Sequence, residues 1–306
     1  MKKTLIQIAL VGVLVTLAAS TAFAQSEDEV LRVDTNLVEL RVRAADRKGK
    51  VLPVQKQDLS VVVDGRSQTI THFSIETIKR YVVMVDVSTS MRGKKFERMC
   101  KAIRALLNSG QDQTFEFYGF ANDVLYLGRA SATDKKHLVL DRLEETYAYG
   151  ETALYDAVTK VLKIHQNDSE ETALVIFTDG EDSCSKTPLE TLEAELSRKG
   201  MLSYLILFNN QLVELDPKSV KDNGAAKKAG TVFQTIFQSV LYYPSDERSL
   251  KEMAASIPRE APYNVHLVFE PDTEAAQPGA HNITVLSKSA VRLTHRQRYS
   301  VERRKQ

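Results

Sequence analysis

The sequence predicts an α/β fold, in which a doubly wound, mainly parallel sheet is flanked by a β-rich unit built from both ends of the chain. Three continuous apolar runs separated by helical patterns indicate strands that are covered on both faces. Segments of period-two alternation on either side of them indicate half-buried strands. Hydrophobic residues make up 43% of the 306 residues and charged residues 26%, which excludes a disordered or collagen-like chain.

The N-terminus predicts secretion. It has two lysines, an apolar core from Leu5 to about Leu17 and the small-x-small triplet Ala22-Phe23-Ala24, which together indicate a signal peptide. Its apolar stretch is shorter than the roughly 20 residues that a membrane span needs. We expect a periplasmic or extracellular protein with no membrane span after cleavage. The predicted segments are a leader (1–24), an N-terminal β segment (25–79), the α/β domain (80–258) and a C-terminal β segment (259–306).

Charge and cysteine content exclude two classes of site. Without the two leader lysines, 39 of the 41 basic residues face 40 acidic ones, so no net field favours nucleic acid. The basic stretch "RQRYSVERRKQ" is interpreted as a solvated terminus. Cys100 falls on an apolar helix face and Cys184 in a polar loop, so a disulfide is possible but not favoured. Two cysteines without partner histidines do not make a zinc site.

The N-terminal β segment is predicted to hold three strands. Val38, Leu40 and Val42 alternate with charged residues, which indicates a half-buried strand whose charged face is exposed. "LSVVVDGRSQTITHF" predicts two strands joined by a hairpin turn at Asp64-Gly65.

The α/β domain is predicted from buried strands at "YVVMV", "ALVIFT" and "LSYLILF". Between them, apolar stripes at helical spacing run from Phe96 to Leu107 and from Leu154 to Leu162. A third helix has Thr187 as its N-cap and Pro188 in its first turn, and it stops at Gly200. A closing helix is predicted at Ser245–Ile257.

Two further segments complete the prediction. The stretch 209–242 is longer and more polar than the rest and looks like an insertion, so its edge strand is not assigned. After Tyr263 the period returns to two, at residues 263–269, 283–285 and 291–293. These C-terminal strands are expected to pack near the N-terminal ones.

Oxygen-bearing side chains follow two of the buried strands. In open α/β sheets, ligands bind outside the carboxyl ends of the strands. Asp86, Ser88 and Ser90 lie at that end of the first strand, and Asp179 in "FTDGED" lies there on another. Thr152 immediately precedes a helix, and we expect it to reach the same crevice. An all-oxygen set suits Mg²⁺ or Mn²⁺, with Ca²⁺ less favoured, and zinc prefers nitrogen and sulfur.

These motifs resemble a known family. The D-x-S-x-S at 86–90, the threonine of G-x-T-x-L-x-D-A at Thr152 and the T-D-G aspartate at Asp179 are similar to the metal-ion-dependent adhesion site of von Willebrand factor type A domains. The resemblance spans roughly residues 80–257, and the flanks resemble a bacterial secreted subfamily. It implies that Ser88 and Ser90 bind the metal directly, with Thr152 and the two aspartates direct or water-bridged.

The resemblance implies a binding module rather than an enzyme. The metal would accept a carboxylate from a partner protein. The alternatives are an envelope assembly or scaffolding protein with a purely structural metal and, less favoured, a Mg²⁺-dependent hydrolase. No phosphate loop, nucleophile elbow or H-E-x-x-H motif is present, so no catalytic residue is proposed. The partner-binding rim is predicted at Met91, Arg92, Tyr149, Glu151 and Glu181.

Overall fold

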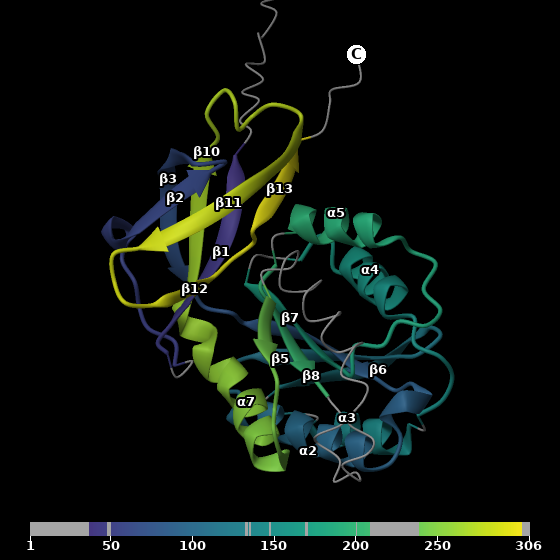
Figure 1. Ribbon diagram of the computed structural model, residues 1–306. Coiled ribbons are helices and arrows are strands. Elements are labelled where there is room, and N and C mark those ends of the chain that lie inside the picture. Colours follow the sequence, from purple (N-terminus) through teal and green to yellow (C-terminus); the bar gives the residue numbers. More distant parts are fainter. Residues whose placement is uncertain are drawn as a thin grey trace, which may run out of the picture. The chain divides into compact units, whose positions relative to one another are not determined.

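The computed structural model describes residues 37–301 except 48–49, 132–133, 135, 147, 169–170, 200 and 209–238. The predicted leader therefore lies outside the described residues, as does most of the polar stretch 209–242. Two sheets are present in the described part, and Figure 1 labels most of their strands. Within this part, no helix is long and apolar enough to cross a membrane.

The first sheet is the predicted doubly wound one. Its described strands lie in the order β6-β5-β4-β7-β8-β9, and all neighbours are parallel except β5 and β6. This mixed, mainly parallel sheet confirms the predicted fold class. The strands are β4 (Arg80–Asp86), β5 (Thr114–Phe120), β6 (Val124–Ser131), β7 (Thr172–Thr178), β8 (Ser203–Leu207) and β9 (Ser239–Tyr242).

Helices cover both faces of this sheet, as Figure 1 shows. Successive residues of a strand point to opposite faces, so Val83 packs with α2 and α7 while Val82 packs with α4 and α5. This two-sided burial explains why the strands read as continuous apolar runs. The helices are α2 (Lys94–Ser109), α3 (Lys136–Glu145), α4 (Leu154–Ile164), α5 (Leu189–Lys199) and α7 (Glu247–Glu260).

The closing helix is longer than predicted. α7 begins after Asp246, whose carboxylate accepts the backbone N–H of Ser249, and the Ser249 side chain reciprocally accepts from the Asp246 backbone. This capping box fixes its start. The helix continues past Ile257 and through Pro258 to Glu260.

The second sheet is antiparallel and joins both ends of the described chain. Strands β1 and β10 pair, as do β2 and β11, so the predicted association of N- and C-terminal strands is confirmed. The described order is β12-β1-β10-β3-β2-β11-β13. The strands are β1 (Val38–Ala45), β2 (Leu59–Val63), β3 (Arg66–Glu76), β10 (Asn264–Glu270), β11 (Gly279–Ser287), β12 (Arg292–Thr294) and β13 (Arg298–Val301).

This sheet has a core of its own. Leu40 and Val42 of β1 share one hydrophobic cluster with Val61 of β2, Val285 of β11 and Tyr299 of β13. Strands at opposite ends of the order thus bury side chains together, so the sheet closes over its own core. Short 3₁₀ helices occur at η1 (Lys56–Asp58), η2 (Thr89–Met91) and η5 (Ala261–Tyr263).

Two sequence predictions about charged residues in this sheet are wrong. The alternation in β1 predicts an exposed face for Arg41 and Arg43, yet both are buried, because Arg41 pairs with Glu76 and Arg43 with Glu260. The basic C-terminal stretch is not wholly solvated either. Its residues 298–301 form β13, and Tyr299 is buried with its hydroxyl donating to the carbonyl of Ala275.

The predicted Asp64-Gly65 hairpin turn is confirmed, and it carries a titratable contact. Both residues have positive φ, at 47° and 83°. The Asp64 carboxylate contacts Nδ1 of His281 on β11 at 2.8 Å, and Nε2 of His281 lies 2.8 Å from the Gln277 carbonyl. Burial alone would lower the pKa of His281, but these two hydrogen bonds outweigh it and raise the pKa above 6.5.

We therefore expect stability to fall as the pH rises through the raised pKa of His281. Below pH 6.5 the imidazole is protonated in the folded and the unfolded chain and the contact contributes fully; the contribution is lost above the folded pKa. The carboxylate of Asp64 is half-exposed, so the effect stays below about 1 kcal/mol. Urea denaturation between pH 5.5 and pH 8 measures it.

A matched control is His281→Phe, which keeps a ring to stack on Tyr299. The partly buried His295 has a pKa lowered by desolvation and contributes the opposite slope in both proteins. Its effect therefore cancels when the two pH profiles are subtracted. Profiles with the same slope would contradict a role for His281.

Candidate functional site

The predicted site residues lie at one edge of the doubly wound sheet. Asp86 is the last residue of β4, and Asp179 follows the last residue of β7. These strands are parallel neighbours, so their carboxyl ends meet at the same edge. This is the edge at which the sequence places the site.

Asp86 is completely buried, and both of its carboxylate oxygens accept hydrogen bonds. The backbone N–H of Ser88 donates to Oδ1 at 2.9 Å, and the Thr178 hydroxyl donates to Oδ2 at 2.6 Å. Burial and the nearby charge of Asp179 raise the pKa of Asp86 to about 7, against the opposing effect of these hydrogen bonds. A cation beside this carboxylate would stabilise its charged form.

The two serines form the next part of the site. Ser88 is buried and precedes η2, so the chain turns sharply after β4. This turn brings the hydroxyl oxygens of Ser88 and Ser90 to 3.0 Å from each other. The serines at every second position of the D-x-S-x-S motif thus place two neighbouring hydroxyl oxygens, which could bind a metal, beside Asp86.

The backbone around Thr152 is tied to the loops after both strands. The N–H of Thr89 donates to the carbonyl of Gly150 at 3.1 Å, and the N–H of Tyr149 donates to that of Val87 at 2.8 Å. The carbonyl of Thr152 accepts from the N–H of Ser183 at 2.8 Å. The buried Thr152 therefore lies between the loop that follows β4 and the loop that follows β7.

The loop after Asp179 is anchored to helix α4. Oδ1 of Asp182 accepts the N–H of Leu154 at 2.9 Å and the hydroxyl of Ser185 at 2.6 Å. In return, Asp156 of α4 accepts the N–H of Thr187 at 2.7 Å. Asp182 satisfies an N–H at the start of α4 that its own helix cannot. These reciprocal contacts fix the segment that carries Thr152.

Sequence reasoning missed two residues that contact the predicted aspartates. Thr178 donates to Asp86, and the ammonium of Lys95 lies 2.9 Å from Oδ2 of Asp179. Thr178 stands beside Asp179 in the quoted T-D-G motif, which was a usable signal. Lys95 lies in the first turn of α2, far from Asp179 in sequence, and no local pattern predicts the pair.

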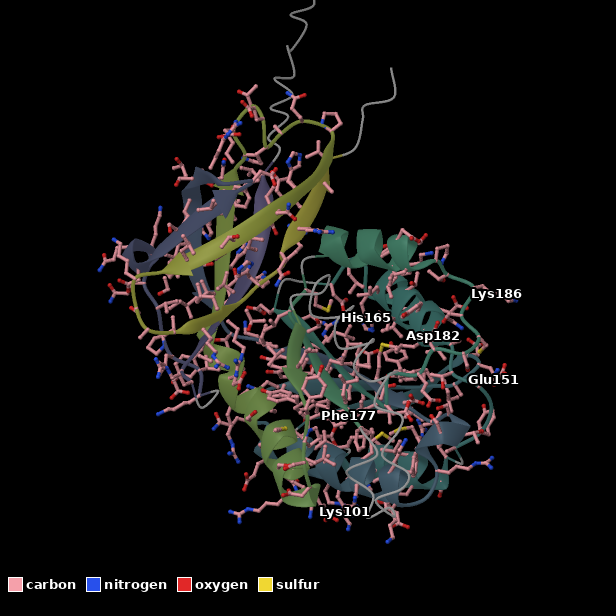
Figure 2. The ribbon with its side chains drawn as sticks, viewed as in Figure 1. Lys101, Glu151, His165, Phe177, Asp182 and Lys186 are labelled. Carbon is pink, nitrogen blue, oxygen red and sulfur yellow. The ribbon has the colours of Figure 1, made fainter. Side chains whose placement is uncertain are left out.

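The predicted rim is only partly exposed. Met91 does not belong to it, because its side chain is fully buried in the core with α2. Arg92 is exposed and its Nε donates to the carbonyl of Ala148 at 2.6 Å. Tyr149 is 56% exposed, and Glu151 and Glu181 are also exposed. Figure 2 shows the Glu151 side chain at the outer side of the molecule.

The donor chemistry fits a small, hard cation. The set consists of carboxylate and hydroxyl oxygens, the ligands that Mg²⁺ and Mn²⁺ prefer. Asp86, Ser88, Thr152 and Asp179 are each less than 5% exposed, so their oxygens have limited access to water. Among the described residues, no group of three or more His, Cys, Asp or Glu side chains is arranged to hold a metal, and this set contains only two carboxylates. Both cysteines are free thiols, with Cys100 buried.

Comparison with known proteins gives one family match, and no curated protein sequence matches the chain. By structure, the chain is similar to von Willebrand factor type A from Catenulispora acidiphila (12% identity, 89% of this chain and 76% of that one, TM-score 0.46). It is also similar to BatB from Bacteroides thetaiotaomicron, with 16% identity over 60% of this chain and 98% of that one and a TM-score of 0.44. The PilB minor pilin from Streptococcus sanguinis has 12% identity over 64% of this chain and 63% of that one, with a TM-score of 0.44.

These structural likenesses are weak, and the sequence match covers only part of the chain. Residues 81–181 match the model of the von Willebrand factor type A domain, and this range includes Asp86, Ser88, Ser90, Thr152 and Asp179. Together with the mixed, mainly parallel sheet covered by helices, the match supports a von Willebrand factor type A domain in this chain.

Proposed function

We propose that this protein is a secreted, metal-dependent protein-binding module. A divalent cation, Mg²⁺ or Mn²⁺, binds among Asp86, Ser88, Ser90, Thr152 and Asp179 and accepts a carboxylate from a partner protein. The observation that carries the proposal is the buried oxygen set at the carboxyl edge of the sheet. Its two buried carboxylates repel each other, and a hard cation that prefers oxygen ligands would offset that repulsion.

The surroundings of the site suggest what the partner presents. The exposed ring of Tyr149 offers an amphipathic surface of the kind that is enriched at protein interfaces. Glu151 and Glu181 give the exposed rim two negative charges against the one positive charge of Arg92, so the rim is acidic on balance. A carboxylate that approaches the metal would be repelled by them unless basic groups accompany it. We expect the partner to carry lysine or arginine next to the carboxylate that reaches the cation.

The role of each part of the chain follows from this proposal. The leader directs the protein to the periplasm or the extracellular space. The antiparallel sheet is the support to which the α/β binding domain is attached. The metal supplies an open coordination position for the partner's oxygen, while Thr178 and the backbone of Ser88 hold Asp86 in place. No group in the described site is assigned a catalytic role. The alternative is a purely structural metal, which the experiment must distinguish from a metal that binds a partner.

The experiment measures cation binding and partner capture with the mature chain, residues 25–306. We expect calorimetry with Mn²⁺ to show binding that Asp86→Ala weakens by more than about 100-fold, beyond the 10–100-fold typical of losing a group that only orients a ligand. Asp141→Ala removes an exposed aspartate from α3 and is the matched control. Its affinity is expected to equal that of the parent.

Capture from an envelope extract then separates binding from scaffolding. A partner retained in Mg²⁺, lost in EDTA and lost with Asp86→Ala is the expected result. Cation binding without any cation-dependent partner would favour a structural metal. If the parent and the Asp141→Ala control both fail to bind a cation, the proposed function is wrong.

A further inference from the structure

Lys95 forms a largely buried ion pair inside the candidate site. Its ammonium lies 2.9 Å from Oδ2 of Asp179, and the two side chains are only 13% and 5% exposed. The neighbouring Lys94 is exposed. The contact is therefore a specific feature of one of two adjacent lysines.

The position of Lys95 is unfavourable for a cation in itself. It is the second residue of α2. The first turn of a helix carries partial positive charge from its unpaired N–H groups, which favours anions and disfavours ammonium groups. Burial of an ammonium adds a further cost unless a charge faces it. The carboxylate of Asp179 offsets both costs, so the pair depends on Asp179 being charged and close.

Charge balance explains why a cation is needed here. Asp86 and Asp179 are both buried at the ends of paired strands, and Thr178, the residue before Asp179, donates to Asp86 at 2.6 Å. Two such carboxylates repel each other in a medium of low dielectric. Lys95 supplies one positive charge to this pair. A divalent cation would supply two, and it would compete with Lys95 for the oxygens of Asp179.

We propose that Lys95 is a built-in counter-cation, which holds Asp179 when no metal is bound and leaves it when a divalent cation enters. The inference rests on the proposed function, because it concerns the same site. Metal binding is then an exchange of cations, and Lys95 weakens the affinity for the metal. The exchange also transfers the ammonium from a buried contact with Asp179 to solvent.

The first test compares Lys95→Met with Lys94→Met. Each variant removes one positive charge from the first turn of α2, but only the first removes the contact with Asp179. We expect Lys95→Met to bind Mn²⁺ at least about tenfold more tightly than the parent, because the metal no longer has to displace an ammonium from Asp179. Lys94→Met is expected to stay within about twofold, since exposed charges are screened.

Thermal unfolding gives a second readout. Lys95→Met leaves Asp179 without its ammonium, so the metal-free variant is expected to melt below the parent. Saturating Mn²⁺ is expected to remove that difference. A metal affinity equal to that of the parent would refute the counter-cation while leaving the proposed function intact. Failure of both proteins to bind Mn²⁺ would refute the proposed function itself.

A measurement on the unmodified chain keeps the test valid if the variant does not fold. Acetylation by an amine-reactive ester, followed by mass spectrometry, reports how accessible each lysine is. Lys95 is expected to react slowly in EDTA and several-fold faster in Mn²⁺, whereas Lys94 should react at the same rate in both. Equal Lys95 rates in a protein that binds Mn²⁺ would overturn the inference.

Discussion

Replacing Arg43 with methionine is expected to destabilise the protein by about 3–5 kcal/mol, the usual cost of removing one partner from a buried ion pair. The guanidinium donates from Nε to one oxygen of Glu260 at 2.7 Å and from a terminal nitrogen to the other at 2.8 Å. Both side chains are about nine-tenths buried. Without Arg43, the Glu260 carboxylate would still accept a hydrogen bond from the Tyr242 hydroxyl at 3.3 Å. It would lose the positive charge that Arg43 supplies.

The expected loss is large because this pair joins distant parts of the chain. Arg43 belongs to β1 of the antiparallel sheet, and Glu260 is the last residue of α7, which packs on the other sheet. Burial would lower the pKa of Arg43, but the paired carboxylate raises it overall, so the guanidinium stays charged. The contact therefore works as a fixed charge pair at every pH at which Glu260 is ionised.

Urea denaturation of three variants tests this account. Arg43→Met/Glu260→Gln removes both charges and is expected to recover more than half of the loss, since no uncompensated charge remains. Arg104→Met breaks an exposed pair with Glu144 and should cost no more than about 1 kcal/mol. A loss in Arg43→Met no larger than in Arg104→Met would mean that water reaches Glu260.

The sequence is most informative where burial is uniform. The runs at β4, β7 and β8 are predictable because both faces of each strand are covered, so nearly every residue is apolar. Strands β5 and β6 and helix α3 were not predicted. β5 includes Glu116, β6 is an edge strand with exposed Leu125 and Tyr126, and α3 has only three buried apolar residues. Partial exposure removes the pattern on which such predictions depend.

Contacts between residues distant in sequence account for the other differences. Arg41 and Arg43 follow an alternation that normally indicates exposed positions, and only the folded chain shows their acidic partners. The same holds for Lys95 and Asp179. The main site residues are locatable from sequence because strand ends in a parallel sheet meet at one edge. Met91 was misassigned because adjacency to a motif does not determine which way a side chain points.

Replacing Gly150 with alanine is expected to destabilise the protein by about 2–4 kcal/mol and to weaken cation binding more than about tenfold. Gly150 has φ +79°, a conformation that costs any residue with a Cβ. A Cβ there would clash with Oδ1 of Asn122, so that side chain must move. The same oxygen accepts the N–H of Glu151 at 3.1 Å, so moving it breaks a hydrogen bond next to Thr152.

Two further variants separate the clash from the backbone cost. Gly65 has φ +83° and nothing within 4 Å of the position that a Cβ would take, so Gly65→Ala carries only the conformational cost of about 1–2 kcal/mol. Gly150→Ala/Asn122→Ala removes the obstructing carboxamide together with its hydrogen bond to Glu151, so it is expected to recover only the part of the difference that comes from the clash. Calorimetry with Mn²⁺ and urea denaturation provide both readouts.

The two readouts together show what the 149–152 loop does. Because the N–H of Thr89 donates to the carbonyl of Gly150, a shift of this loop also reaches the turn that holds Ser88 and Ser90. Lower cation affinity with Gly150→Ala but not with Gly65→Ala would therefore place the loop in the metal site. Equal stability losses and unchanged affinity would show that Asn122 moves aside freely, and that Thr152 is positioned by its contacts with Ser183 and Cys184.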